Sequence, residues 1–252
     1  MSLLLYGVVR ADHKDPVGLA GAGPGATDVR LIRSSTLAAA VSDIDEVALA
    51  DADAYTYLDV LTALLHDGPV LPVRFGTYGP DDNAIRVQIL DYAASELTAR
   101  LDALEGLVEV RINITADEEA ELRLLLATSP ALAKTVRHPS ETFSDLEFSI
   151  EVGEAVSRGL EERRAALQGS VLARLGDCAV SEAPCPTDSH TRLSHAFLLR
   201  QEDLPAFDEA VRLFGEDLPA WYVLEYVGPL PAVDFLKVAL PQPRHAPNRW
   251  GW

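Results

Sequence analysis

The order of apolar and polar residues along this 252-residue chain predicts a mixed α+β protein. Residues Leu3 to Val9 form a continuous apolar run, which is typical of a buried β-strand. Two further apolar stretches, residues 29–33 and 37–44, are separated by two serines and predict a β-hairpin. From Val108 to Ile114 apolar and polar residues alternate strictly, which predicts a strand with one buried and one solvated face, as in antiparallel sheets.

Two amphipathic helices are predicted on either side of a proline-rich segment. The first begins near Asp51 or Asp53, which are good N-cap residues, and continues to His66. The second covers residues 81–103, where apolar residues repeat every four positions. We expect both helices to cover one face of an antiparallel-rich sheet. Together these elements predict an N-terminal α+β domain of residues 1–115.

The second half of the chain predicts a helical connector followed by another α+β domain. An acidic helix is expected over residues 116–133, a break over 137–144 and a long helix over 145–175 with coiled-coil-like apolar spacing. Strand, strand, helix and strand follow at residues 178–183, 192–200, 204–214 and 221–227. Helix, strand, strand, helix, strand is most of a ferredoxin-like unit. We therefore expect a connector at 116–144, a ferredoxin-like domain at 145–235 and a tail at 236–252.

The most distinctive segment is residues 68–77, with the sequence Gly-Pro-Val-Leu-Pro-Val-Arg-Phe-Gly-Thr. Each proline removes a backbone donor, so the segment cannot lie in the middle of a regular sheet. The pattern is typical of a short or bulged edge strand, and an exposed edge could pair with a strand of another protein. The partner-binding residues predicted here are Val70, Leu71, Arg74, Phe75 and Tyr78.

This segment, in its place between two predicted helices, resembles the gas vesicle protein F/L family (GvpF/GvpL-type accessory proteins). The resemblance includes Leu-Tyr-Gly-Val-Val at residues 5–9 and Leu-Ala-Ala-Ala-Val-Ser at residues 37–42. It continues at residues 101–113, 196–199, 228–231 and Phe235. Family members carry a histidine early in the helix before the proline-rich strand, and aromatic residues near the C-terminus. This chain has Tyr55 and Tyr57 at the first place, and Leu230 and Val233 at the second.

The resemblance implies a minor component that helps to assemble the protein shell of a gas-filled organelle. Such a protein would act by binding the main shell protein and other gas vesicle proteins. It would need no catalytic residue, cofactor or metal, and it would be cytoplasmic and associated with the gas vesicle. The resemblance does not distinguish the F type from the L type.

Composition narrows the classes of partner. The chain has 39 acidic residues against 21 lysines and arginines, a formal net charge of −18. So acidic a protein repels nucleic acid and anionic lipid, and we expect neither as a partner. The charge could serve solubility alone or attract a basic protein. No apolar run approaches the roughly 20 residues that span a bilayer, and no signal-peptide pattern is visible. We therefore expect a cytoplasmic protein without a membrane partner.

No residue pattern predicts an active site, a cofactor site or a metal site. No two of the six histidines have the spacing that places two ligands on one helix face. Cys178 and Cys185 have neither the redox nor the zinc spacing, which favours two reduced thiols. The glycine-rich residues 21–25 lack the lysine of a phosphate-binding loop and precede a strand, so a nucleotide site is not expected.

Charged residues near the distinctive segment form one further candidate. Glu109 and Arg111 share the polar face of the alternating strand, and with Arg74 they could form a salt-bridge network across the sheet. The network could simply satisfy polar groups near the sheet. Alternatively, together with Phe75 and Tyr78, it could line a recognition surface.

The predicted tail is basic, proline-rich and ends with the sequence Arg-Trp-Gly-Trp. The tail could fold back onto the acidic remainder of the same chain, contact a partner or be disordered. We include Arg249, Trp250 and Trp252 among the predicted partner-binding residues.

Two other functions stay open. One is a small-molecule-binding or catalytic protein with a pocket near Arg74, and the other is a scaffold that oligomerises through the helix of residues 145–175.

Overall fold

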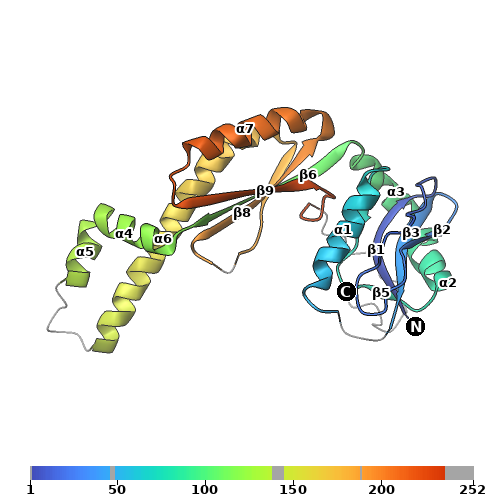
Figure 1. The fold of residues 1–252 in the computed structure, drawn as a ribbon, viewed down its shortest axis with the longest axis horizontal. Coiled ribbons are helices and arrows are strands. Elements are labelled where there is room, and N and C mark those ends of the chain that lie inside the picture. The colour runs from blue at the N-terminus through green and yellow to red at the C-terminus, as the bar shows by residue number, and fades with distance from the viewer. Residues whose placement is uncertain (1, 46–48, 138–144, 188, 236–252) are drawn as a thin grey trace. The chain divides into compact units, whose positions relative to one another are not determined.

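The computed structural model of this protein describes residues 2–45, 49–137, 145–187 and 189–235 (Figure 1). As predicted, these residues have a mixed α+β fold, with two antiparallel sheets and seven α-helices. They form two compact units. One holds the described residues up to Glu109 and those from Gly228 onward, and the other holds residues 110–227. The predicted domain boundaries after residues 115, 144 and 235 stay predictions. Residues 138–144 of the predicted break, and the predicted tail, lie outside the described residues.

The first unit is built on an antiparallel sheet in the order β2-β3-β1-β4, with β5 also paired to β1. The hairpin predicted from the two serine-linked stretches is confirmed by the pairing of β2 with β3. The long apolar run becomes the central strand. The strands are β1 (Ser2–Arg10), β2 (Arg30–Arg33), β3 (Leu37–Ile44), β4 (Leu71–Pro72) and β5 (Tyr78–Gly79).

The helices of this unit lie on both faces of the sheet, which corrects the expectation that they cover one face. Strand β1 is buried on both faces. Helices α1 and α3 both contact β1. Helix α1 packs in a core cluster with residues of β1 and β3, and this cluster contains no residue of α2 or α3. Figure 1 shows α1 on one side of the strands and α2 and α3 on the other. The helical segments are α1 (Asp53–Leu65), α2 (Asp82–Ile85), the π-helical turn η1 (Arg86–Asp91) and α3 (Ala94–Ala103).

The second sheet has the order β7-β8-β6-β9, which is the strand order of a complete ferredoxin-like βαββαβ unit. Its first strand is β6, which the sequence analysis placed in the N-terminal sheet. That placement is wrong, because β6 lies between β8 and β9. The strands are β6 (Leu107–Ala116), β7 (Ser181–Pro184), β8 (Arg192–Arg200) and β9 (Tyr222–Leu230).

Three helices connect β6 to β7, and one connects β8 to β9. The predicted acidic helix is divided at Ser129, because Pro130 follows it and begins a second helix. Both parts contact α6, and Leu125, Leu132 and Leu160 form the core between them. The elements are α4 (Glu118–Thr128), α5 (Pro130–Arg137), α6 (Asp145–Leu175) and α7 (Leu204–Asp217), with short 3₁₀ turns η2 (Gly176–Cys178) and η3 (Gln201–Asp203).

Helix α6 contains two glycines with opposite surroundings, and these give a matched test of its packing. A Cβ added at Gly159 would lie 2.5 Å from Leu125 Cδ1 of α4, whereas one added at Gly169 would meet nothing within 4 Å. We expect Gly169→Ala to stabilise the protein by about 1 kcal/mol through helix propensity, and so to raise Tm by roughly 2–4 °C. Gly159→Ala should lose this gain. Thermal unfolding by circular dichroism measures both, and an equal gain at the two positions would contradict the α4–α6 packing.

Candidate protein-interaction site

The proline-rich segment forms two very short strands joined by a turn. Strand β4 pairs with the second half of β1, with Pro72 opposite Gly7, and β5 pairs with the first half, with Tyr78 opposite Leu4. Between them the chain bulges away from β1 at residues 73–77. Gly76 has a φ of +81° there, a backbone conformation that glycine adopts without strain.

The hydroxyl of Tyr57 on helix α1 links this turn to strand β1. It lies 2.7 Å from the carbonyl oxygen of Tyr6 and in even shorter contact with the carbonyl oxygen of Val73. Burial raises the pKa of Tyr57, so the hydroxyl keeps the proton that it donates to these oxygens. The Tyr57 ring also stacks on Tyr6 and meets the edge of Phe75, with centroids 5.3 and 5.2 Å apart.

The predicted site residues of this segment divide into core and surface. Val70 and Leu71 are each 1% exposed, so their side chains belong to the core, and the prediction of an exposed edge at these residues is wrong. Phe75 and Tyr78 are half-buried and pack against the same core cluster. Arg74 is exposed, and within the described residues it forms no ion pair. The turn therefore presents one free cation beside two partly exposed aromatic rings.

Glu109 and Arg111 are not in the sheet that carries Arg74, so the predicted network across a single sheet is wrong. Both lie on β6, whose polar face is less solvated than the alternation predicted. Glu109 is fully buried and accepts a hydrogen bond of 2.8 Å from the backbone N–H of Asp234. Arg111 is half-buried. The other predicted residues, Arg249, Trp250 and Trp252, lie outside the described residues.

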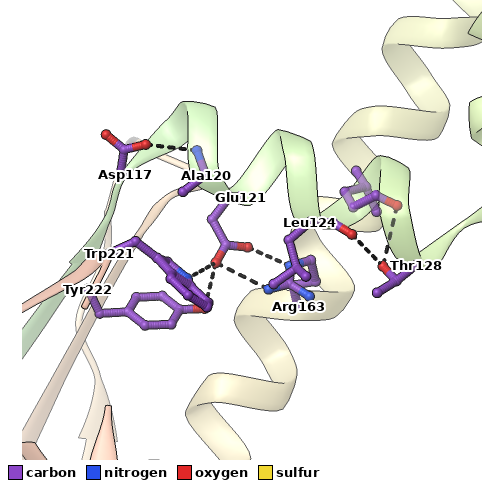
Figure 2. A network of polar contacts seen from close by, with 9 residues as sticks. Asp117, Ala120, Glu121, Leu124, Thr128, Arg163, Trp221 and Tyr222 are labelled. Atoms are coloured by element: carbon purple, nitrogen blue, oxygen red, sulfur yellow. Dashed lines mark hydrogen bonds and ion pairs between the residues drawn. The ribbon is translucent and has the colours of Figure 1, made fainter. Parts of the chain in front are cut away.

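A polar cluster in the second unit joins α4, α6 and the beginning of β9 (Figure 2). The carboxylate of Glu121, which is 4% exposed, accepts hydrogen bonds from Arg163 on both oxygens. The Tyr222 hydroxyl donates to the same carboxylate at 2.6 Å and the Trp221 indole N–H at 3.3 Å. These donors satisfy a buried charge that would otherwise be costly.

The electrostatics of Glu121 follow from these contacts. Burial alone would raise the pKa of this carboxyl. The hydrogen bonds from Arg163 and Tyr222, with the charge of Arg163, outweigh burial and lower the pKa below its ordinary value of 4.5. A cavity of about 20 Å³ lies beside the cluster, lined partly by Glu121, Arg163 and Tyr222. A space of this size holds one water molecule. The cluster therefore holds helices on a sheet rather than a metabolite.

Two further features of the described residues bear on ligand binding. No group of three or more His, Cys, Asp or Glu side chains in these residues could hold a metal ion. An open acidic depression is lined by Leu3, Asp43, Pro80, Asp81, Asp82 and Asn83. Arg30 already binds Asp82 there through hydrogen bonds of 2.7 and 2.9 Å. Arg74 lines neither this depression nor the small cavity. No helix in the described residues is both long and apolar enough to cross a bilayer.

The family model for "Gas vesicle synthesis protein GvpL/GvpF" matches residues 2–237. The chain belongs to the GvpL/GvpF family. The resemblance inferred from the proline-rich segment is thereby confirmed. Gas vesicle protein F of Streptomyces sp. (strain CB03234) is 29% identical over 240 residues, which cover 94% of this chain and 100% of that protein.

Solved structures of family proteins confirm the fold. The crystal structure of GvpF from Microcystis aeruginosa has a TM-score of 0.74 at 19% identity, covering 92% of this chain and 97% of that one. The crystal structure of GvpF from Anabaena sp. PCC7120 has a TM-score of 0.76 at 18% identity, covering 94% and 99%.

Sequence reasoning missed two residues that organise the GvpL/GvpF fold in this chain. Tyr57 was noted as a departure from the family pattern, and nothing in the sequence near it reveals two carbonyl partners. Glu121 lies in the predicted acidic helix of residues 116–133 and was not singled out there. Its position four residues before Leu125 places it on the buried stripe of α4, and this spacing could have singled it out.

Removing the Tyr57 hydroxyl tests the anchor of the turn. We expect Tyr57→Phe to destabilise the protein by about 2 kcal/mol, because two buried carbonyl oxygens lose a donor. Amide exchange at residues 73–77 should accelerate as well. Tyr55→Phe is the matched control, since Tyr55 lies on the same helix and is 76% exposed. Equal stabilities for the two variants, measured by chemical unfolding, would show that the hydroxyl contributes nothing.

The lowered pKa of Glu121 predicts that Glu121→Gln loses folding stability to an extent that depends on pH. A depressed carboxyl pKa contributes stability that is present above the unfolded-state value and disappears as the pH falls through the folded-state value. We therefore expect Glu121→Gln to lower Tm at pH 7, and the difference from wild type to narrow as the pH falls below 4.5. Glu119→Gln, at an exposed position of the same helix, should show no such trend. A difference that stays constant with pH would contradict the charged state of Glu121.

Proposed function

We propose that this protein is an accessory or minor structural component of gas vesicles that binds the main shell protein, and other vesicle proteins, during assembly. The observation that carries the proposal is the family match over residues 2–237. In this proposal the protein works in the cytoplasm on forming vesicles. It acts by contact with other polypeptides and carries out no catalytic step.

Physical chemistry supports a binding role of this kind. A vesicle shell subunit must be apolar to face gas, and apolar subunits aggregate in water before they assemble. A binding factor with a formal net charge of −18 keeps such a complex soluble. A local contact site is then needed on this charged surface. The turn at residues 73–77 is the site that we propose, because it places an exposed cation beside aromatic side chains on a rigid frame.

Arg74→Glu tests this contact site. We expect the variant to retain less shell protein in a pull-down with purified components, by about tenfold, because a charge-assisted hydrogen bond or cation–π contact is replaced by repulsion. Arg158→Glu on α6 is the matched control, since it makes the same change of charge at an exposed position of the other unit. Both variants should unfold at the wild-type temperature, because neither side chain is buried.

The same variants can be scored in cells. A vesicle-forming host that lacks this gene should lose buoyancy and intact vesicles in electron micrographs, and wild type and Arg158→Glu should restore them. Normal vesicles in the deletion strain would refute the proposed function as a whole. Restoration by Arg74→Glu, with its pull-down unchanged, would refute only the turn as the contact site.

A further inference from the structure

Strand β9 is one of the two edge strands of the second sheet, and its nine residues are long enough to accept a partner strand. Within the described residues it has a neighbour, β6, on one side only. Three side chains on one of its faces are exposed, with Val223 61% and Val227 40% accessible and Glu225 between them. The proline-rich edge of the first sheet, by contrast, is buried.

The direction of the backbone groups on β9 follows from one hydrogen bond. The N–H of Asp117, directly after β6, donates to the carbonyl of Trp221, directly before β9, at 2.8 Å. Because a trans peptide points its N–H opposite to its carbonyl, the N–H of Tyr222 points away from β6, where it already donates to the carbonyl of Pro219 at 3.0 Å. Backbone groups alternate in direction along a strand, so those of Leu224 and Tyr226 face outward too. Leu224 and Tyr226, beyond the Pro219 contact, therefore form the template for an added strand.

The other face of β9 is held in place by the unit itself. Tyr226 packs near Phe207 of α7, with ring centroids 6.3 Å apart, and its hydroxyl donates to Asp208 at 2.6 Å. At the beginning of the strand Tyr222 is tied to Glu121. The strand is therefore presented rigidly, and an added strand would not have to order it first.

Charge selects the occupant of this edge. Glu225 is exposed and forms no ion pair within the described residues, and Asp208 adds a second exposed acid beside the strand. The only cation of β6, Arg111, is half-buried. A second copy of this chain fits poorly, because pairing that centres on the exposed segment sets Glu225 against its own counterpart. Like charges directly opposite each other are destabilising.

We propose that the outer edge of β9 binds an extended segment of another protein as an added strand, selected by a lysine or arginine that faces Glu225 between apolar residues. Pairing of backbone groups supplies the affinity, and Glu225 with the two valines supplies the selection. This recognition concerns a different unit and different residues from the Arg74 turn. It stands or falls separately from the proposed role in gas vesicles.

The experiment uses the full chain and two labelled peptides. In each peptide every second residue is threonine, and the residues between the threonines are valine, one charged residue and valine. The charged residue is lysine in one peptide and glutamate in the other. We expect wild type to bind the lysine peptide about fivefold more tightly by fluorescence anisotropy, since a cross-strand charge pair contributes up to about 1 kcal/mol. Amide exchange at Leu224 and Tyr226 should slow when the peptide is bound.

Charge exchange makes the result decisive. Glu225→Lys should reverse the preference and favour the glutamate peptide, whereas Glu154→Lys, the same change at an exposed position of α6, should leave it unaltered. Neither variant should change Tm, because both side chains are exposed. If millimolar peptide produces no protection at Leu224 and Tyr226, or if Glu225→Lys leaves the preference as it was, the proposal is overturned. Glu225 would then only protect the edge against pairing.

Discussion

The central strand β1 of the first unit must find hydrogen-bond partners along both of its edges, and much of this unit follows from that requirement. Strand β1 is buried on both faces, so water cannot satisfy its backbone. On one edge β3 pairs with it almost throughout. On the other edge the partners come from a segment with two prolines, which cannot form a continuous ladder. Two short strands, β4 and β5, pair with β1 on that edge, and individual hydrogen bonds satisfy the backbone of β1 between them.

Those single contacts explain the rigidity of the turn at residues 73–77. The Leu5 N–H donates to the Thr77 carbonyl at 2.9 Å, and the Val73 N–H donates to the Tyr6 carbonyl at 3.0 Å. The Tyr57 hydroxyl reaches the same Tyr6 carbonyl from helix α1. A bulge at the centre of an edge strand is thus held at both of its ends. Arg74 is exposed between Val73 and Thr77, the two residues that are hydrogen-bonded to β1.

Local patterns predicted most of the elements, because runs and periodicity report burial directly. The apolar run at residues 3–9 and the four-residue repeat at 81–103 became β1 and the segment α2–η1–α3. Which sheet a strand joins is a long-range property, and alternation alone cannot reveal it. The strand at 108–114 was therefore placed in the wrong sheet, although the strand–strand–helix–strand order downstream lacked the one strand that it supplies.

The candidate site was predictable only in part, for a related reason. Proline at positions 69 and 72 predicted an edge strand, and β4 is one. That the edge is covered depends on α3, which contacts β4 but lies more than twenty residues further along the chain. Likewise, the sequence marks the helix that carries Glu121 only as acidic. The burial of Glu121 depends on Arg163, from a helix 42 residues away. Residue type and spacing do not reveal contacts between residues so far apart in the sequence.

The two units present their exposed groups in a common way, by display on a fixed frame rather than by enclosure. In the first unit a network of backbone contacts holds an exposed cation. In the second, aromatic and charged contacts from α4 and α7 hold one face of β9 while the other face and the outer edge stay accessible. An enclosed site gains selectivity by burying its ligand and needs a pocket of several hundred Å³. A displayed edge or turn needs only a rigid support and one well-placed charge, and this arrangement suits a partner that is itself a polypeptide surface.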